Sequence, residues 1–162
     1  MTLKRVLVAT DFGEPSDAAV TYGRNIARVF AATLHIVHVI DDACAHGTPP
    51  LSQTFDVAQL QRTYEHSARE ALDGLLDPQM RTEGVVTEIL TGSRPAPVIL
   101  SYAKESMIDL IVMGTHGRRG FADLFMGSVA QQVVRDADCP VLTLRRSSTI
   151  HVDGARAMTE SV

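Results

Sequence analysis

The sequence is poor in cysteine and contains no long hydrophobic run, and both absences restrict what the protein can be. Its 162 residues include two cysteines, Cys44 and Cys139, which are far apart and form no C-x-x-C motif. They indicate neither a zinc site nor a disulfide framework, and a reducing, cytoplasmic setting is the simplest interpretation. The longest apolar runs, such as DLIVM, are too short to cross a bilayer, and no signal-peptide cleavage site follows the N-terminal apolar run. We expect no membrane partner.

Positive charge is also scarce. The chain has 15 basic and 19 acidic residues and a formal net charge of −4, so broad binding to nucleic acid is not expected. Its only lysines are Lys4 and Lys104, which excludes the G-K-S or G-K-T of a Walker A motif. The first strand candidate is followed by VATDFGEPSD, which lacks the G-x-G-x-x-G of dinucleotide-binding folds. Two familiar phosphate motifs are therefore absent.

Short apolar runs alternate along the chain with longer segments of helical period. The runs typical of strands are 5–9, 33–39, 85–90, 109–113 and 140–145. The segments typical of helices are 16–30, 57–75, 96–106 and 128–136. This alternation predicts one α/β domain over residues 1–146, built as an open parallel sheet with helices on both faces. Residues 147–162 are polar and without period, and we expect a loosely ordered tail.

Ligands of such folds bind beyond the carboxyl ends of the strands. The residues at these ends are Thr10-Asp11, Val39-Ile40, Thr91-Gly92 and Met113-Gly114. The last of these opens the segment VMGTHGRRGFADLFMGSVAQQVV, in which Gly117 and Gly120 follow Gly114 at intervals of three. Gly127 and Ser128 then begin a helix, with Ser128 as a good N-cap. Glycine-turn amides and the first amides of a helix both bind anions, so this segment predicts a phosphate site.

Other residues leave two interpretations open. Asp11 either contacts a ligand or only caps a turn. His116 and Arg118 either lie along the phosphates or face water, and Arg119 is more consistent with solvent. His35 and His38 lie three apart in a strand, so their side chains are expected on opposite faces of the sheet and do not form a metal pair.

Three segments together carry a family resemblance. GTHGRRGFADLFMGS has the spacing Gly, two residues, Gly, nine residues, Gly-Ser, and it occurs with VLVATDFGEPSDAA near the start and ADCPVLTLR near the end. Over residues 2–146 the chain resembles universal stress proteins of the UspA type, in particular their ATP-binding branch.

The resemblance implies a Rossmann-like five-stranded parallel sheet of strand order 3-2-1-4-5 that binds ATP together with Mg²⁺. It places Asp11 on the ribose or adenine side, Val39 in the adenine pocket, and Gly127 on the outer phosphates. It also implies a homodimer through strand 140–145, and an exposed apolar edge strand favours such pairing on physical grounds. The full set of nucleotide-binding residues that it implies is Thr10, Asp11, Val39, Met113, Gly114, His116, Gly117, Arg118, Gly127, Ser128 and Val129.

The sequence thus favours a nucleotide-dependent sensor or regulator of a stress response. An ATP-hydrolysing enzyme is an alternative, but the glycine-rich loop, residues 114–127, contains no glutamate or glutamine, and its only acid is Asp123. We therefore name no catalytic residue and no protein ligand for a metal. A third hypothesis is a dimeric interaction protein that binds no nucleotide.

Overall fold

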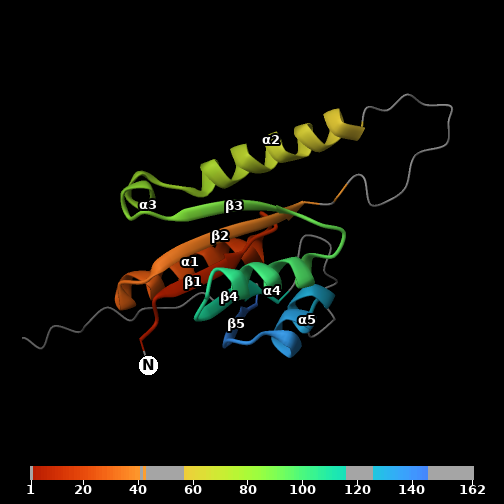
Figure 1. Cartoon of the computed structure of the whole chain (residues 1–162). Coiled ribbons are helices and arrows are strands. Elements are labelled where there is room, and N and C mark those ends of the chain that lie inside the picture. Colours follow the sequence, from red (N-terminus) through yellow and green to blue (C-terminus); the bar gives the residue numbers. More distant parts are fainter. Residues whose placement is uncertain (1, 41, 43–56, 116–125, 146–162) are drawn as a thin grey trace, which may run out of the picture.

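The computed structural model describes residues 2–40, 42, 57–115 and 126–145. Within these ranges the strands are β1 (Arg5–Ala9), β2 (Thr33–Ile40), β3 (Val86–Thr91), β4 (Leu110–Gly114) and β5 (Val141–Leu144). The helices there are α1 (Glu14–Phe30), α2 (Val57–Leu75), α3 (Pro78–Thr82), α4 (Pro95–Glu105) and α5 (Ser128–Asp136). The strands form one parallel sheet of order β3-β2-β1-β4-β5 (Figure 1). The predicted fold class and strand order are confirmed.

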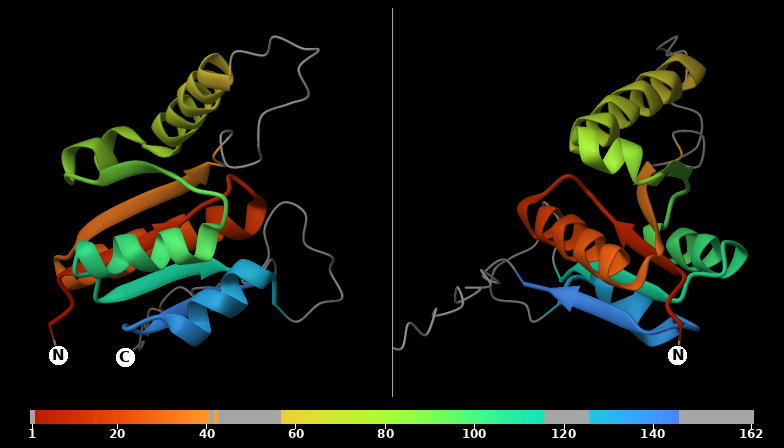
Figure 2. Two further views of the ribbon diagram at one scale, coloured as in Figure 1. Left: turned by 45° about the vertical axis from the view of Figure 1, so that its right-hand side comes forward. Right: turned by 90° about the vertical axis from the view of Figure 1, so that its left-hand side faces the viewer.

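The sheet is covered on both faces, as a parallel sheet requires. Val6 and Val8 of β1 pack toward α1 and α2, whereas Leu7 between them packs toward α4 and α5, and all three side chains are fully buried. Figure 2 shows α1 and α4 on opposite sides of the sheet. Both faces of each central strand thus lie in a hydrophobic core, and this is why these strands appear in the sequence as continuous apolar runs.

Helix α1 begins at Glu14, two residues earlier than the sequence predicted. Gly13 is the N-cap residue, and Pro15 lies in the first turn. N–H groups in the first turn have no acceptor within the helix, so proline, which lacks an N–H, costs no helical hydrogen bond there. Ser16 lies at the third helical position and its Oγ accepts a hydrogen bond from Gly13 N at 3.0 Å. The serine therefore bonds back to the cap residue, and it is not itself the cap.

Helix α3 was not predicted, because five residues are too few to show a helical period. Its local signals are nevertheless present in the sequence. The Asp77 carboxylate caps the helix by accepting from Met80 N at 2.8 Å, and Pro78 occupies the first turn. Arg24 of α1 donates to Asp77 at 2.6 Å, which links α3 to α1.

Strand β4 begins at Leu110, one residue later than predicted, because Asp109 has a different role. Its Oδ2 accepts hydrogen bonds from Lys4 N at 2.7 Å and Arg5 N at 2.9 Å, which joins the start of β4 to the start of β1. These two backbone donors lower the pKa of the Asp109 carboxyl below its ordinary value.

We expect Asp109→Asn to lower stability at neutral pH and to make it less sensitive to acid. A carboxyl with a lowered folded-state pKa contributes stability above its unfolded pKa, near 3.9, and this contribution is lost as the pH falls through the lower folded value. The melting temperatures of wild type and variant should therefore converge below about pH 3–4. Thermal unfolding from pH 7 to pH 2 measures this, with Asp73→Asn on the exposed face of α2 as the control. A constant difference at all pH values would contradict the role of the charge.

Candidate functional site

The carboxyl ends of β1 and β4 lie side by side, with Ala9 paired to Met113 in the sheet register. The chain continues from β1 to β2 and β3 on one side, and from β4 to β5 on the other. The strand order therefore reverses between β1 and β4, which is where ligands bind in open parallel sheets. The structure brings the turn after β1, the end of β4 and the start of α5 to this edge of the sheet, which corresponds to the ligand-binding crevice of such folds.

The turn after β1 is held by bonds among its own residues. Thr10 is buried, and its Oγ1 accepts from Phe12 N at 3.0 Å and donates to Ser16 Oγ at 3.1 Å. Asp11 Oδ1 accepts from Gly13 N at 3.2 Å, so Asp11 does cap its own turn. Phe12 has a φ of 60°, the left-handed conformation that non-glycine residues seldom adopt. Asp11 is half-buried just beyond the carboxyl end of β1, and a carboxylate can accept more than one hydrogen bond.

The glycine segment is fastened at both ends. Thr115 donates its N–H to Leu144 O at 2.8 Å, and its own carbonyl accepts from Gly127 N at 2.6 Å. The start of α5 is therefore attached directly to the end of β4, next to Gly114. The Gly127 amide is used in this bond, so its direct donation to a phosphate, which the sequence suggested, would require the bond to open.

The amino terminus of α5 still offers amide donors. Gly127 is the N-cap, where Ser128 had been expected, and Ser128 is the first helical residue. The first intrahelical bond runs from Gln131 N to Gly127 O at 2.9 Å. The amides of Ser128, Val129 and Ala130 consequently have no acceptor inside the helix, and the helix dipole makes this end favourable for anions.

Of the other predicted site residues, two have side chains packed in the core and three lie outside the described residues. Met113 is 5% exposed and Val39 is partly buried, and both side chains pack on the α4 and α5 face. They can line the crevice chiefly with their backbone. His116, Gly117 and Arg118 lie outside the described residues.

Sequence reasoning missed one residue beside the crevice, His38 of β2. Its Nδ1 lies 2.8 Å from Thr10 O, and its ring centroid is 4.4 Å from that of Phe12. His35 faces the other side, where its Nδ1 lies 2.9 Å from Tyr102 Oη, so the predicted opposite orientation is confirmed. Burial lowers the pKa of His35. The feature of the sequence that could have drawn attention to His38 is that this polar residue interrupts an otherwise apolar strand.

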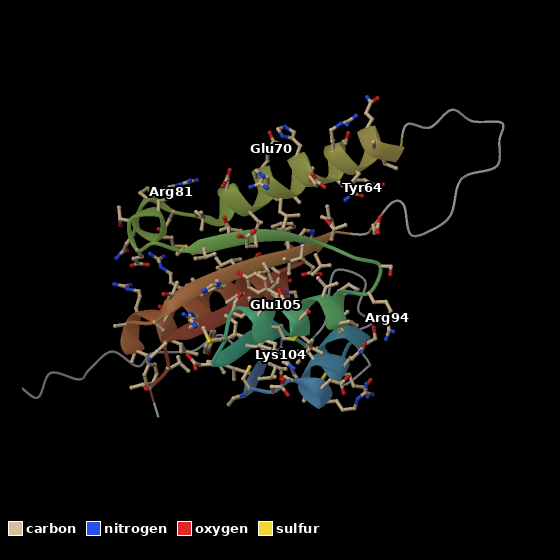
Figure 3. The ribbon with its side chains drawn as sticks, in the orientation of Figure 1. Tyr64, Glu70, Arg81, Arg94, Lys104 and Glu105 are labelled. Carbon is tan, nitrogen blue, oxygen red and sulfur yellow. The ribbon has the colours of Figure 1, made fainter. Side chains whose placement is uncertain are left out.

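A separate cavity of about 220 Å³ lies between the C-terminal ends of α4 and α5. Ala103, Ile108 and Cys139 line it, together with Lys104, which Figure 3 labels on α4. Burial raises the pKa of the Cys139 thiol. The cavity lies near the amino ends of β4 and β5, at the opposite end of the sheet from the crevice.

Two kinds of feature are absent from the described ranges. No group of three or more His, Cys, Asp or Glu side chains there is arranged to hold a metal ion. No helix in these ranges is both long and apolar enough to span a bilayer.

The fold and the crevice define an open α/β protein with an anion-favourable helix terminus beside its switch point. The model of the universal stress protein family matches residues 2–145, and the chain belongs to that family. A universal stress protein of Methanocaldococcus jannaschii is 33% identical over 146 residues, which cover 88% of this chain and 82% of the relative. The solved UspA of Lactobacillus plantarum is 28% identical with a TM-score of 0.76, covering 90% of this chain and 99% of that one. The UspA-type resemblance is confirmed.

Two further solved structures share the fold and contain nucleotides. One is a universal stress protein in complex with cAMP, 24% identical with a TM-score of 0.58, covering 91% of this chain and 100% of that chain. The other is from Archaeoglobus fulgidus in complex with dAMP, 23% identical with a TM-score of 0.56, covering 89% and 99%.

Proposed function

We propose that this protein binds an adenine nucleotide, ATP foremost, in the crevice between β1 and β4, and acts in the cytoplasm as a nucleotide-dependent regulator of a stress response. The observation that carries the proposal is the bond between Gly127 N and Thr115 O. It holds the first amides of α5 next to the end of β4, at the edge of the sheet where the Asp11 turn also lies, so that the proposed phosphate and ribose contacts would meet at one switch point.

The chemistry of the crevice fits such a ligand. An anion at the start of α5 gains about 0.3–1 kcal/mol from the helix dipole, in addition to bonds from the Ser128 and Val129 amides. Gly114 and Gly127 carry no Cβ, which lets phosphate oxygens approach the backbone. Asp11 would accept hydrogen bonds from the ribose or the base. His116, Gly117 and Arg118 would extend along the triphosphate.

The identity of the base is supported by the relatives. The cAMP and dAMP complexes both contain adenine, on the fold that this chain shares. Mg²⁺ would bind mainly to phosphate oxygens and water, as it commonly does beside nucleotides, and would need few protein ligands. Nucleotide binding would act by favouring the conformation that holds ATP better, which requires no turnover.

The regulator would be a homodimer joined through β5. Two backbone bonds, Ile111 N to Pro140 O at 3.0 Å and Thr115 N to Leu144 O at 2.8 Å, join β5 to β4. They show that the N–H and C=O groups of the even-numbered residues around β5 point toward β4. Because successive residues of a strand direct their N–H and C=O groups to opposite sides, those of Val141 and Thr143 point to the open edge of the sheet. An open edge of this kind is suited to pairing with a second copy.

The proposal is tested by identifying and then titrating the ligand. Purified protein is denatured, the released small molecules are identified by mass spectrometry, and the nucleotide-free protein is titrated with ATP and Mg²⁺ by calorimetry. We expect Gly127→Val to weaken ATP binding by about 10- to 100-fold, because a side chain there would block roughly one charged hydrogen bond. Gly127 has a φ of −69°, which valine can adopt, so the fold should survive.

The matched control is Gly74→Val on α2, where nothing lies within 4 Å of an added Cβ. It should bind ATP like the wild type. ATP affinity that is unchanged in Gly127→Val would contradict the phosphate assignment, and a wild type that binds no adenine nucleotide would refute the proposal.

A further inference from the structure

A single side chain from β2, that of His38, contacts both neighbours of Asp11. Its Nδ1 lies 2.8 Å from the carbonyl oxygen of Thr10, and its ring lies against the ring of Phe12 at 4.4 Å with an interplanar angle of 40°. Asp11 is the residue between these two contacts.

The bond to Thr10 fixes the direction of donation. A carbonyl oxygen can only accept, so His38 Nδ1 must carry a hydrogen and donate it. Thr10 also donates its own N–H to Val37 O at 2.9 Å. Both polar backbone groups of Thr10 are therefore attached to β2, one through the ladder and the other through the histidine.

The contact with Phe12 supports an unfavourable backbone conformation. Phe12 has a φ of 60°, and a bulky residue keeps this conformation only where its surroundings impose it. The Phe12 amide is bonded to Thr10 Oγ1 on one side of the turn, and the ring is packed on His38 on the other. The orientation of Asp11 follows from the positions of its two neighbours.

We propose that His38 is the positioning residue for the Asp11 turn, which it holds in the geometry needed for the ribose or base of the nucleotide. The inference rests on the proposed function for its ligand, and on the observed contacts for its mechanism. A turn fixed before binding loses less conformational entropy on binding, so removing the restraint should weaken nucleotide affinity.

The test uses substitutions that separate the hydrogen bond from the bulk of the side chain. His38→Leu keeps an apolar body but has no donor. His38→Asn has a smaller side chain, but its amide nitrogen can take the place of Nδ1 as donor. His66→Leu, the same change at an exposed histidine of α2, is the control.

Amide hydrogen exchange in the nucleotide-free protein, resolved by NMR, reports the turn directly. We expect exchange of the Phe12 and Gly13 amides to accelerate by about tenfold in His38→Leu, roughly the loss of one hydrogen bond, and to return toward the wild-type rate in His38→Asn. The amides of Val6 to Val8 should be unchanged. ATP affinity measured on the same variants should follow the same order, with His66→Leu equal to the wild type.

The outcomes distinguish the inference from the function on which it rests. Unchanged exchange in His38→Leu, or equal acceleration in the leucine and asparagine variants, would overturn the positioning role while leaving ATP binding in place. Faster exchange with unaltered ATP affinity would overturn the link between the turn and the ligand. A wild type that binds no adenine nucleotide would refute the proposed function, and the exchange rates would then decide only whether His38 orders the turn.

Discussion

Replacing Gly23 by alanine is expected to destabilise the protein by up to about 2 kcal/mol, although alanine is the better helix former. Gly23 lies in the middle of α1, on the face that packs on the sheet. An ideal Cβ at this position would overlap Cγ2 of Val8 in β1. Val8 is fully buried and, being β-branched, has little rotamer freedom to yield.

The size of the effect follows from two opposing contributions. Alanine in place of a helical glycine stabilises by about 1 kcal/mol, whereas an extra methyl group in a well-packed core costs about 1–3 kcal/mol. The steric contribution prevails at Gly23, because helix and strand must separate to admit the Cβ. Gly23→Val adds two further methyl groups and should be worse.

Gly74→Ala is the matched control for this prediction. Gly74 is also helical, in α2, but nothing lies within 4 Å of an added Cβ. Only the helix-forming contribution remains, so this variant should gain up to about 1 kcal/mol. Urea denaturation of the two variants and the wild type measures the difference. If both substitutions stabilise, the close approach of α1 to β1 is not what requires glycine at position 23.

Thr143→Pro is expected to convert the proposed dimer to a monomer. The Thr143 N–H points to the open edge of β5, so proline removes a donor to the partner and leaves the bonds between β5 and β4 intact. In a two-fold dimer each substitution counts twice. Losing two hydrogen bonds costs about 2–3 kcal/mol, which is roughly a hundredfold in the dissociation constant.

The same change at the other edge of the sheet is the control. The bond from Gly92 N to Ile40 O at 3.1 Å shows that the N–H and C=O groups of even-numbered residues in β3 point toward β2. The Thr87 N–H therefore points to the outer edge of the sheet, as the Thr143 N–H does at the other edge. Thr87→Pro should leave the oligomeric state unchanged. Analytical ultracentrifugation across a range of concentrations measures both variants. A dimer that survives Thr143→Pro, or dissociates in Thr87→Pro, would contradict pairing through β5.

The sequence predicted the sheet well because its central strands are buried on both sides and stand out as apolar runs. It was less accurate at element ends, where single polar contacts decide. Glu14 rather than Ser16 begins α1 because Ser16 bonds back to Gly13, and Asp109 lies outside β4 because it accepts from the start of β1. Such contacts join residues far apart in sequence, or reverse the role that a residue type usually has.

The candidate site shows the same limit. The positions of Asp11 and Gly114 at strand ends followed from the alternation of elements alone. That the Gly127 amide would be used by Thr115 O did not follow, because the bond depends on how α5 meets β4. His38 was missed because a histidine inside a strand gives no indication of which loop its ring will reach.

Because of the bond between Thr115 and Gly127, the number of residues between them can change in evolution at little cost in stability. Because the two ends are already joined, the helix terminus keeps its place whatever length of chain connects them. Doubling such a connection adds only about 0.6 kcal/mol to the entropy cost of closing it. Insertions between these two residues would therefore change the surroundings of the proposed nucleotide's outer phosphates without displacing the amides that are proposed to bind them.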